Sequence, residues 1–379
     1  MNFHPNGNVS ICCVCKMDSP NSGFYKNNGS MMNLNNDPLK NLWEDSSVNK
    51  IREDMLNDKK PLACKGCYDI EDNGGVSRRQ IENKRWGRHK EKPNLEFLDL
   101  RISNLCNLKC MMCNGDSSSA LAKDYSKWSD KLPFVFKNDI KPDMFNWFNE
   151  DFIDQLMKYK DSIKYLYING GEPFIIDLHW KFLERLIEEG VAKNIHVSYN
   201  TNCTTYDKKF SEYWKHFKRV TLGMSVDAIG EKDKFIRHPS NWDIVNKNVL
   251  NLLEDPALNH INITCTIQWL NAPFLNEFYD WAVPMINKKK RAVINQNFVV
   301  FPNFLSLNCA SIEFKKELKN IYSKSKHKDL ILSQTMLSYL NHESENDILW
   351  KEGIEFLDTV SDSRNMGDWK KIFNHEYKY

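Results

Sequence analysis

The segment Asn104-Leu-Cys-Asn-Leu-Lys-Cys-Met-Met-Cys-Asn114 places Cys106, Cys110 and Cys113 in a C-x3-C-x2-C spacing. Soft thiolate ligands select iron–sulfur clusters or zinc, and a short loop can bring three thiolates to one face of a cluster. A [4Fe-4S] cluster normally has four cysteine ligands, so three would leave one iron with an open position. We therefore predict a cluster that binds a further ligand, rather than a zinc knuckle that lacks a ligand or a group of buried thiols.

The sequence around this loop predicts alternating strands and helices. Strands are predicted at residues 95–103, 164–169, 195–199, 219–225, 261–269 and 292–300, with helices after Gly115, at 177–189 and 207–217, within 231–253 and at 274–281. Apolar strands that alternate with helices indicate a parallel sheet with both faces covered. In barrels of this kind the active site lies at the carboxyl ends of the strands.

The cysteine spacing, the strand before it and Asn169-Gly-Gly-Glu-Pro173 after it resemble the radical S-adenosylmethionine (SAM) superfamily. Within it, the chain is similar to the proteins that contain a twitch or SPASM domain. The resemblance implies an α/β fold with a partial (β/α)6 barrel. It also implies that the open iron binds the amino and carboxylate groups of SAM. An electron from the reduced cluster then cleaves SAM to methionine and a 5′-deoxyadenosyl radical, which abstracts a hydrogen atom from the substrate.

The same resemblance assigns SAM contacts, most of them at strand ends. In chain order they are Met112, Gly170, Gly171, Glu172, Asn200, Asn202, Ser225, Arg237 and Ile267. Glycines let a backbone approach a ligand closely, and a guanidinium can hold a carboxylate through two hydrogen bonds. Met112 and Ile267 fit the protein core equally well, and Asn200 and Asn202 could simply be turn residues. No general acid or base stands out; Tyr199, Cys203, Asp227 and His238 are unranked candidates.

A second group of cysteines precedes the barrel. It comprises Cys12, Cys13, Cys15, Cys64 and Cys67, with an amphipathic helix predicted between residues 41 and 57. The layout is similar to a twitch-type module, which implies a second, auxiliary [4Fe-4S] cluster. We predict Cys13, Cys64 and Cys67 as its ligands, and Cys12 or Cys15 as the fourth. A structural zinc site with four cysteines is the alternative.

These patterns divide the chain into an auxiliary-cluster module at 1–92, a barrel at 93–302 and a helical extension at 303–379, with Trp350, Phe356 and Trp369 as expected packing anchors. Lysine and arginine number 52 against 50 acidic residues, so the net charge of +2 does not favour nucleic acid or a membrane as a partner. No apolar run approaches the ~18 residues of a membrane helix, and the start lacks the features of a signal peptide. We expect a cytoplasmic protein with reduced cysteines.

The resulting hypothesis is an enzyme, an oxidoreductase or modifying enzyme of the radical SAM type. The first interpretation of its substrate is a peptide or protein side chain, oxidised with help from the auxiliary cluster. A nucleotide or sugar-derived small molecule is the second, and a non-catalytic metal-binding protein is the third. The expected partners are the substrate and a reductant such as flavodoxin or ferredoxin.

Overall fold

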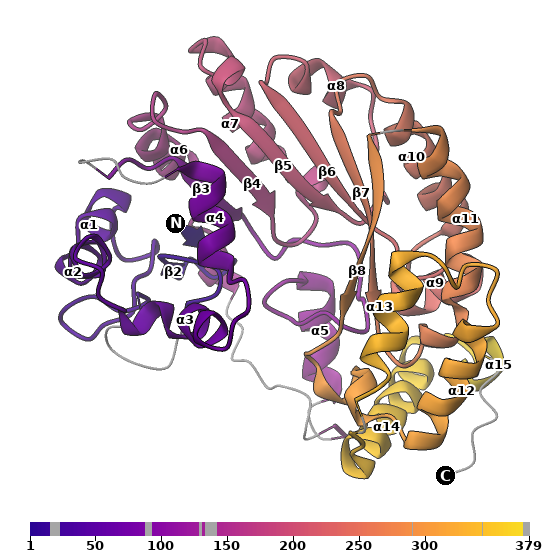
Figure 1. Cartoon of the computed structure of the whole chain (residues 1–379). Helices are drawn as coiled ribbons and strands as arrows, with labels where there is room; N and C mark the ends of the chain where they lie inside the picture. Colours follow the sequence, from indigo (N-terminus) through magenta and orange to yellow (C-terminus); the bar gives the residue numbers. More distant parts are fainter. Residues whose placement is uncertain are drawn as a thin grey trace. The chain divides into compact units, whose positions relative to one another are not determined.

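Within the part of the chain that the structure describes, eight strands form a mixed sheet. The computed structural model describes residues 1–15, 23–87, 93–128, 131–132, 142–289, 291–342 and 344–373 (Figure 1). The strands are β1 (Asn2–Phe3), β2 (Val9–Ser10), β3 (Phe97–Arg101), β4 (Tyr165–Asn169), β5 (His196–Thr201), β6 (Arg219–Ser225), β7 (His260–Ile267) and β8 (Ala292–Phe298). Six of them, β3 to β8, lie where apolar periodicity predicts strands, which confirms the α/β fold class.

Helices follow the strands as predicted. They are α1 (Leu39–Trp43), α2 (Ser46–Leu56), α3 (Lys65–Asp72), α4 (Arg78–Trp86), α5 (Ser119–Trp128), α6 (Glu150–Met157), α7 (Asp177–Glu188), α8 (Lys209–Trp214), α9 (Gly230–Ile236), α10 (Trp242–Glu254), α11 (Leu275–Lys288), α12 (Ile312–Ser323), α13 (Ile331–Tyr339), α14 (Asp347–Arg364) and α15 (Trp369–Ile372). The single helix expected between residues 41 and 57 is in fact two, because the Asp45 side chain accepts a hydrogen bond from the Ser47 N–H and starts α2.

The chain forms two compact units. The first contains Met1–Asn104, Ile140–Ser198 and His216–Arg219, and the second contains Leu105–Asp139, Tyr199–Lys215 and Val220–Tyr379. In the first unit β1 pairs in parallel with β3, β3 pairs in parallel with β4, and β2 lies antiparallel to β1. In the second unit β6, β7 and β8 pair in parallel in that order. The expected boundary at residue 92 lies outside the described residues.

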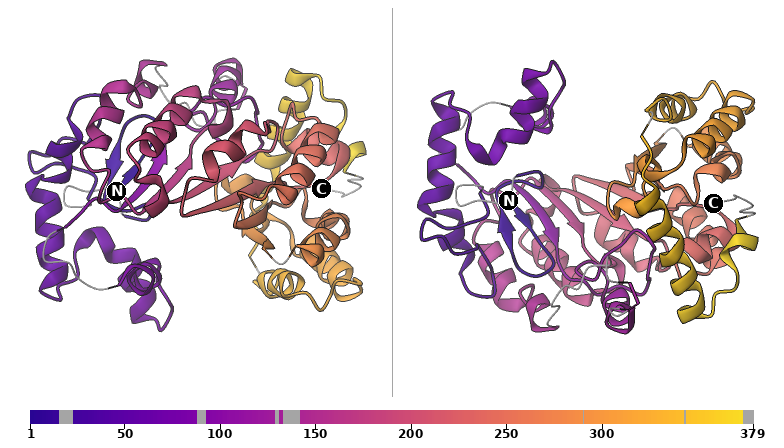
Figure 2. Two further views of the ribbon diagram at one scale, coloured as in Figure 1. Left: turned by 90° about the horizontal axis from the view of Figure 1, so that it is seen from above. Right: turned by 90° about the horizontal axis from the view of Figure 1, so that it is seen from below.

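The first residues of the chain belong to the core of the first unit. Phe3 is fully buried, with its ring centroid 6.0 Å from that of Trp147 and 5.8 Å from that of Phe152. The indole Nε1 of Trp147 donates to the carbonyl of Pro5 at 2.8 Å. Both views in Figure 2 show the N-terminus at these indigo strands. Sequence analysis assigned no strand here because two-residue strands are too short to show a period.

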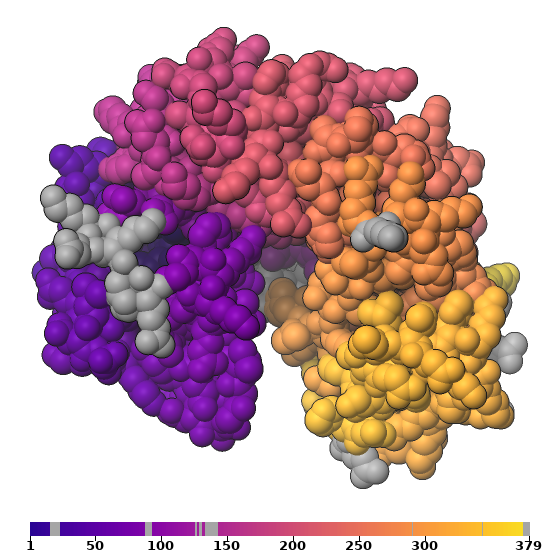
Figure 3. Space-filling model, turned by 45° about the horizontal axis from the view of Figure 1, so that its top comes forward, coloured from indigo at the N-terminus to yellow at the C-terminus, as the bar shows by residue number. Residues whose placement is uncertain are grey.

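In the second unit α11 packs against β8, and the helices α12 to α15 make up the predicted helical extension (Figure 3, orange to yellow). Trp269, which follows β7, is fully buried and donates through Nε1 to the carbonyl of Phe304 at 2.8 Å. Its ring centroid lies 4.6 Å from that of Trp350 and 5.9 Å from that of Trp369. The extension therefore packs on the barrel through aromatic side chains, as expected. Among the described residues, no helix is both long and apolar enough to cross a membrane.

Candidate functional site

The cysteine loop of the second unit is held by backbone hydrogen bonds to the last residue of α9 and to the segment that follows it. The N–H of Lys109 donates to the carbonyl of His238 at 2.5 Å, and that of Met111 donates to the carbonyl of Ile236 at 2.9 Å. Cys110, between these two bonds, is buried, whereas Cys106 and Cys113 are half-buried. A segment more than a hundred residues further along the chain thus sets the path of the loop.

Hydrogen-bond donors lie close to two of the three sulfurs. The N–H of Leu108 lies 3.5 Å from Cys106 Sγ, and Asn202 Nδ2 lies 4.0 Å from the same sulfur. The guanidinium Nη1 of Arg237 is 3.8 Å from Cys110 Sγ. Donors aimed at sulfur stabilise thiolates, the form in which cysteine binds metal. This donor set fits a [4Fe-4S] cluster held by the loop.

Burial opposes ionisation of these thiols in the protein alone. It raises the pKa of Cys113 to about 11 and raises that of Cys110 as well. A bound metal deprotonates its thiol ligands, so cluster binding would release protons. Among the described residues, no three His, Cys, Asp or Glu side chains converge as ligands of one metal ion. A four-iron cube spreads its cysteine ligands farther apart than a single ion does.

Arg237 forms a buried ion pair with Asp227. Its Nε lies 2.7 Å from Asp227 Oδ2, and the two side chains are 10% and 0% exposed. The other carboxylate oxygen of Asp227 accepts the N–H of Thr266 at 2.7 Å. Burial would lower the pKa of Arg237, but Asp227 and the nearby Cys110 raise it overall, so the guanidinium stays charged. Arg237 was predicted to bind the SAM carboxylate; in this structure its partners are Asp227 and Cys110.

The second unit contains further predicted SAM contacts. Asn202 donates through Nδ2 to Asn107 Oδ1 at 3.0 Å, which ties the turn after β5 to the cysteine loop. Ser225 is the last residue of β6 and is half-buried. Met112 is half-buried in the loop, whereas Ile267 is fully buried at the end of β7, as a core residue would be. Asn200 is exposed at the end of β5.

Gly170, Gly171 and Glu172 follow β4 in the first unit. Gly170 has φ +84°, and a Cβ there would lie 2.8 Å from Arg101 Cα, so only glycine allows this close approach to β3. Glu172 is 1% exposed, and its Oε1 accepts the N–H of Phe174 at 3.1 Å. Glu172 therefore caps the turn that follows β4, a local role that the motif alone does not indicate.

Four of the five auxiliary cysteines of the first unit line a cavity of about 420 Å³. Its lining includes Cys12, Cys15, Cys64 and Cys67, together with apolar side chains. Cys13, which sequence analysis preferred as a ligand, lines a smaller neighbouring cavity of about 210 Å³ and is exposed. Four soft ligands around one cavity fit a [4Fe-4S] cluster, and this arrangement favours both Cys12 and Cys15.

Two family models match the chain. The model described as the radical SAM superfamily matches residues 100–266, which include the cysteine loop and the ends of β4 to β6. The SPASM model, described as an iron-sulfur cluster-binding domain, matches residues 1–68. The chain is a radical SAM protein. The fold is the partial barrel of this superfamily, preceded by an iron–sulfur module as predicted, and its cofactors are SAM, a [4Fe-4S] cluster and further iron–sulfur clusters.

This radical SAM protein is similar to several known proteins at low identity. It is 21% identical over 294 residues, 72% of this chain and 91% of the relative, to an uncharacterised protein of Methanocaldococcus jannaschii. It is 26% identical over 203 residues, 52% of this chain and 40% of the relative, to the radical SAM cyclopropyl synthase TigE of Paramaledivibacter caminithermalis.

Solved structures similar to the chain include two that contain SAM. One is anSMEcpe with bound AdoMet and Cp18Cys peptide, at 17% identity and a TM-score of 0.40, covering 67% of this chain and 63% of that one. Another is Streptococcus suis SuiB bound to S-adenosylmethionine, at 16% identity and a TM-score of 0.39, covering 75% and 59%. The radical SAM protein thus spans less than two thirds of the length of these two proteins.

The unranked acid and base candidates of this radical SAM protein are mostly inaccessible. Tyr199, Cys203 and Asp227 are fully buried, and Asp227 is ion-paired. Burial raises the pKa of Tyr199. His238 is half-buried; burial, with Arg364 and Lys109 nearby, lowers its pKa to about 4, so its ring is neutral at pH 7. Only His238 exposes part of its surface, which the sequence could not reveal.

A network that sequence analysis missed links the cysteine loop to the helical extension. Arg364, the last residue of α14, donates through Nη1 to the carbonyl of Lys109 at 2.9 Å and through Nε to Asp124 Oδ2 at 2.9 Å. Asp124 also binds Lys109 Nζ at 3.0 Å. The guanidinium lies 4.9 Å from the ring centroid of Trp128, and its side chain is 3% exposed. The extension thus supports the loop between two of its cysteines.

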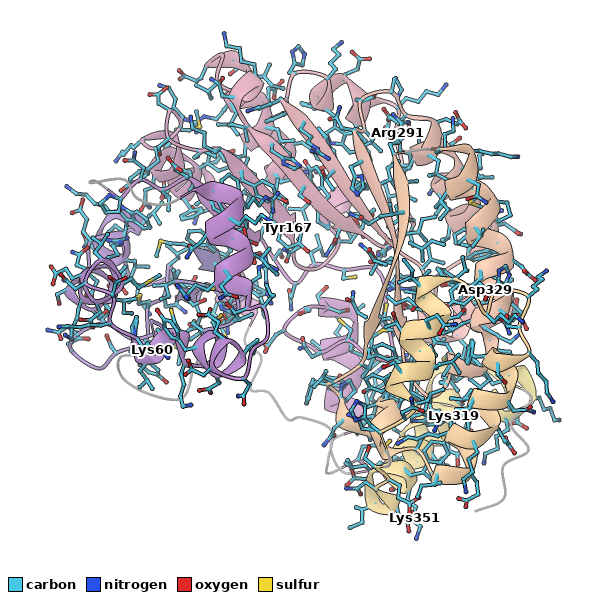
Figure 4. All side chains as sticks on the ribbon, viewed as in Figure 1. Lys60, Tyr167, Arg291, Lys319, Asp329 and Lys351 are labelled. Atoms are coloured by element: carbon cyan, nitrogen blue, oxygen red, sulfur yellow. The ribbon has the colours of Figure 1, made fainter. Side chains whose placement is uncertain are left out.

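Replacing Arg364 with alanine should speed the loss of iron from the loop of the radical SAM protein. The change removes the hydrogen bonds to the Asp124 carboxylate and to the Lys109 carbonyl. We expect the free energy of unfolding to fall by about 1–3 kcal/mol. Iron release to a chelator and urea unfolding measure the two effects. Lys351→Ala is the matched control, because Lys351 is exposed on the same helix (Figure 4). Equal iron release from the two variants would show that Arg364 does not support the loop.

Proposed function

We propose that the protein reductively cleaves SAM and abstracts a hydrogen atom from a peptide or protein side chain. The observation that carries the first part is the loop of Cys106, Cys110 and Cys113, with donors beside two of its sulfurs and a buried ion pair behind it. The second part rests on the resemblance to SPASM-domain proteins, which include peptide-modifying enzymes. The auxiliary cluster is proposed to assist an oxidation.

When bound, the cluster and SAM supply a 5′-deoxyadenosyl radical, with one electron provided by a reductant such as flavodoxin or ferredoxin. The chain's own residues position these groups. The bonds of Lys109 and Met111 hold the loop, and Arg237 places a positive charge beside Cys110. Ser225 and Asn200 are proposed to contact SAM at the ends of β6 and β5. Gly170, Gly171 and Glu172 are proposed to bind its amino group.

The proposal is tested by anaerobic reconstitution with iron and sulfide, followed by SAM and dithionite. We expect about eight irons per chain, two cubes, and formation of 5′-deoxyadenosine. The control is the variant in which Cys106, Cys110 and Cys113 are all alanine, which should keep about four irons and form no 5′-deoxyadenosine. If the fully loaded protein forms none, with or without added peptides, reductive cleavage is ruled out. Zinc in place of iron would indicate a non-catalytic metal-binding protein.

Peptide labelling tests the substrate. With a pool of short peptides deuterated at their side chains, deuterium should appear in 5′-deoxyadenosine, because the hydrogen is taken from the peptide. Deuterium transfer from a labelled nucleoside or sugar, and none from the peptides, would overturn the peptide assignment while leaving the radical chemistry in place.

A further inference from the structure

Strand β8 carries side chains that strands normally avoid. It reads Ala292-Val-Ile-Asn-Gln-Asn-Phe298, with three carboxamides in succession. Asparagine is depleted in strands because its side chain does not pack well on a pleated, half-buried surface. Departures from local preference in natural proteins concentrate at functional sites. The groups that these carboxamides can contact depend on which face of the sheet they occupy.

The two faces of β7 and β8 differ in chemistry. Burial alternates along β7, with Ile261, Ile263, Cys265 and Ile267 buried. On β8 the side chain of Gln296 donates to the hydroxyl of Tyr279 on α11, which covers that face (Figure 1). Successive side chains point to opposite faces, so Asn295 and Asn297 point away from α11. Both are exposed.

Polar residues of three strands form rows on this second face. Strand register pairs Ser225 with Thr264, and Thr264 with Asn295. The next row pairs Thr266 with Asn297. Residues directly opposite one another on neighbouring strands share a face and lie within contact distance. The row Ser225, Thr264 and Asn295 therefore begins at a proposed SAM contact and extends onto β8.

Asn200 reaches the same region. A Cβ on Gly223 would lie 2.3 Å from Asn200 Oδ1, so the side chain of Asn200 occupies the space that glycine leaves on β6. Gly223 precedes Ser225 by two residues and shares its face. The proposed SAM contacts Asn200 and Ser225 therefore lie at the β6 end of the polar rows. From there the rows extend across β7 to β8.

The rows are polar but uncharged. In the described part of the chain, the side chains of Thr264, Asn295 and Asn297 make no hydrogen bond. A phosphorylated ligand is held by arginine, lysine or a metal ion, and these rows offer none of them. A carboxamide presents one acceptor and a donor group, the same pair that a peptide group presents. Asn295 and Asn297 lie about 6.6–6.8 Å apart along the strand, the repeat of same-facing groups in an extended peptide.

We infer that Thr264, Asn295 and Asn297 form a binding strip for the main chain of an extended, unphosphorylated peptide. The inference rests on the proposed function and deepens it, since it names residues that would hold the peptide beside SAM. Recognition through main-chain groups reads an extended conformation and tolerates varied side chains. The absence of arginine and lysine from the rows also argues against a phosphorylated nucleotide as the ligand.

The test measures binding of a pool of short, unphosphorylated random peptides to the reconstituted protein with SAM and without reductant. We expect the double variant Asn295→Ala/Asn297→Ala to bind the pool about five- to 150-fold more weakly, because two hydrogen bonds are lost. Asn251→Ala, the same change on the exposed side of α10, is the matched control and should bind like the parent. Unchanged iron content shows that the double variant is folded.

Peptides with methylated backbone nitrogens test main-chain recognition directly. Methylated peptides should bind the parent more weakly than unmethylated peptides do. This difference should be smaller for the double variant, which keeps only Thr264 of the strip. Equal binding of the unmethylated pool by parent and double variant would overturn the inference, as would preferential binding of nucleoside monophosphates or sugars to the parent. Because no reductant is present, these results are independent of whether 5′-deoxyadenosine forms, so the inference and the proposed function can fail separately.

Discussion

Replacing Asp227 with alanine should lower the free energy of unfolding by about 3–5 kcal/mol, because it leaves the buried guanidinium of Arg237 without its carboxylate. The 2.7 Å ion pair is nearly inaccessible to water, so solvent cannot replace the lost partner. The change also removes the acceptor of the Thr266 N–H. We expect the unpaired Arg237 to shift away from Cys110 and the loop to lose its iron. Urea unfolding and iron content measure the two losses.

The control substitution for this prediction lies on α9, the helix that ends next to Arg237. Lys234 and Glu231 form an exposed pair on α9, with side chains 56% and 74% exposed. Such pairs contribute about 0.2–1 kcal/mol at most, so Lys234→Ala should leave unfolding and iron content almost unchanged. If Asp227→Ala unfolds at the same urea concentration as Lys234→Ala and keeps its iron, the ion pair does not stabilise the loop.

Single cysteine variants of the first unit should divide into two classes by iron content. Alanine at Cys12, Cys15, Cys64 or Cys67 should lower the iron from about eight toward about four per chain, since each substitution removes a proposed ligand of the auxiliary cluster. Cys13→Ala should keep about eight irons. The reason is positional: the first four residues line one cavity, whereas Cys13 lines the smaller neighbouring cavity, which Cys12 also borders. Iron and sulfide analysis of anaerobically reconstituted variants gives the counts.

Cys13→Ala serves as the internal control for this series, because it removes a thiol from the same segment without removing a proposed ligand. Iron lost from Cys13→Ala and retained in Cys12→Ala or Cys15→Ala would restore the ligand set preferred from the sequence. Zinc bound to the first unit in place of iron would support the structural zinc alternative. In every variant the loop of Cys106, Cys110 and Cys113 should keep its own four irons.

Much of the fold could be predicted because its signals are local. Alternating burial along β7 follows directly from its residues, and burial also alternates along β8, where Asn295 and Asn297 occupy exposed positions. The strand β1 was missed since two residues carry no period. The division of residues 41–57 into α1 and α2 depended on one cap, Asp45, which the apolar pattern did not reveal.

The site could be predicted only in part. The spacing of Cys106, Cys110 and Cys113 suffices to predict a cluster loop, because the ligands lie within eight residues. The contact of Arg237 with the SAM carboxylate stays a prediction. Its ion pair with Asp227, ten residues earlier, could not be predicted, because it depends on how β6 and α9 are placed around the cysteine loop.

The amino-acid sequence was sufficient to indicate the alternating strands and helices and the three-cysteine loop, since these depend on short-range periodicity and spacing. The partial barrel and the class of chemistry followed from the resemblance to the radical SAM superfamily. Tertiary structure alone decided which side chains surround the loop and the auxiliary cavity. Arg364 meets Lys109 from 255 residues away, and Arg237 meets Cys110 from 127 residues away. Such contacts form only when the strands and helices pack together, because no local pattern encodes which distant charges are buried against each other.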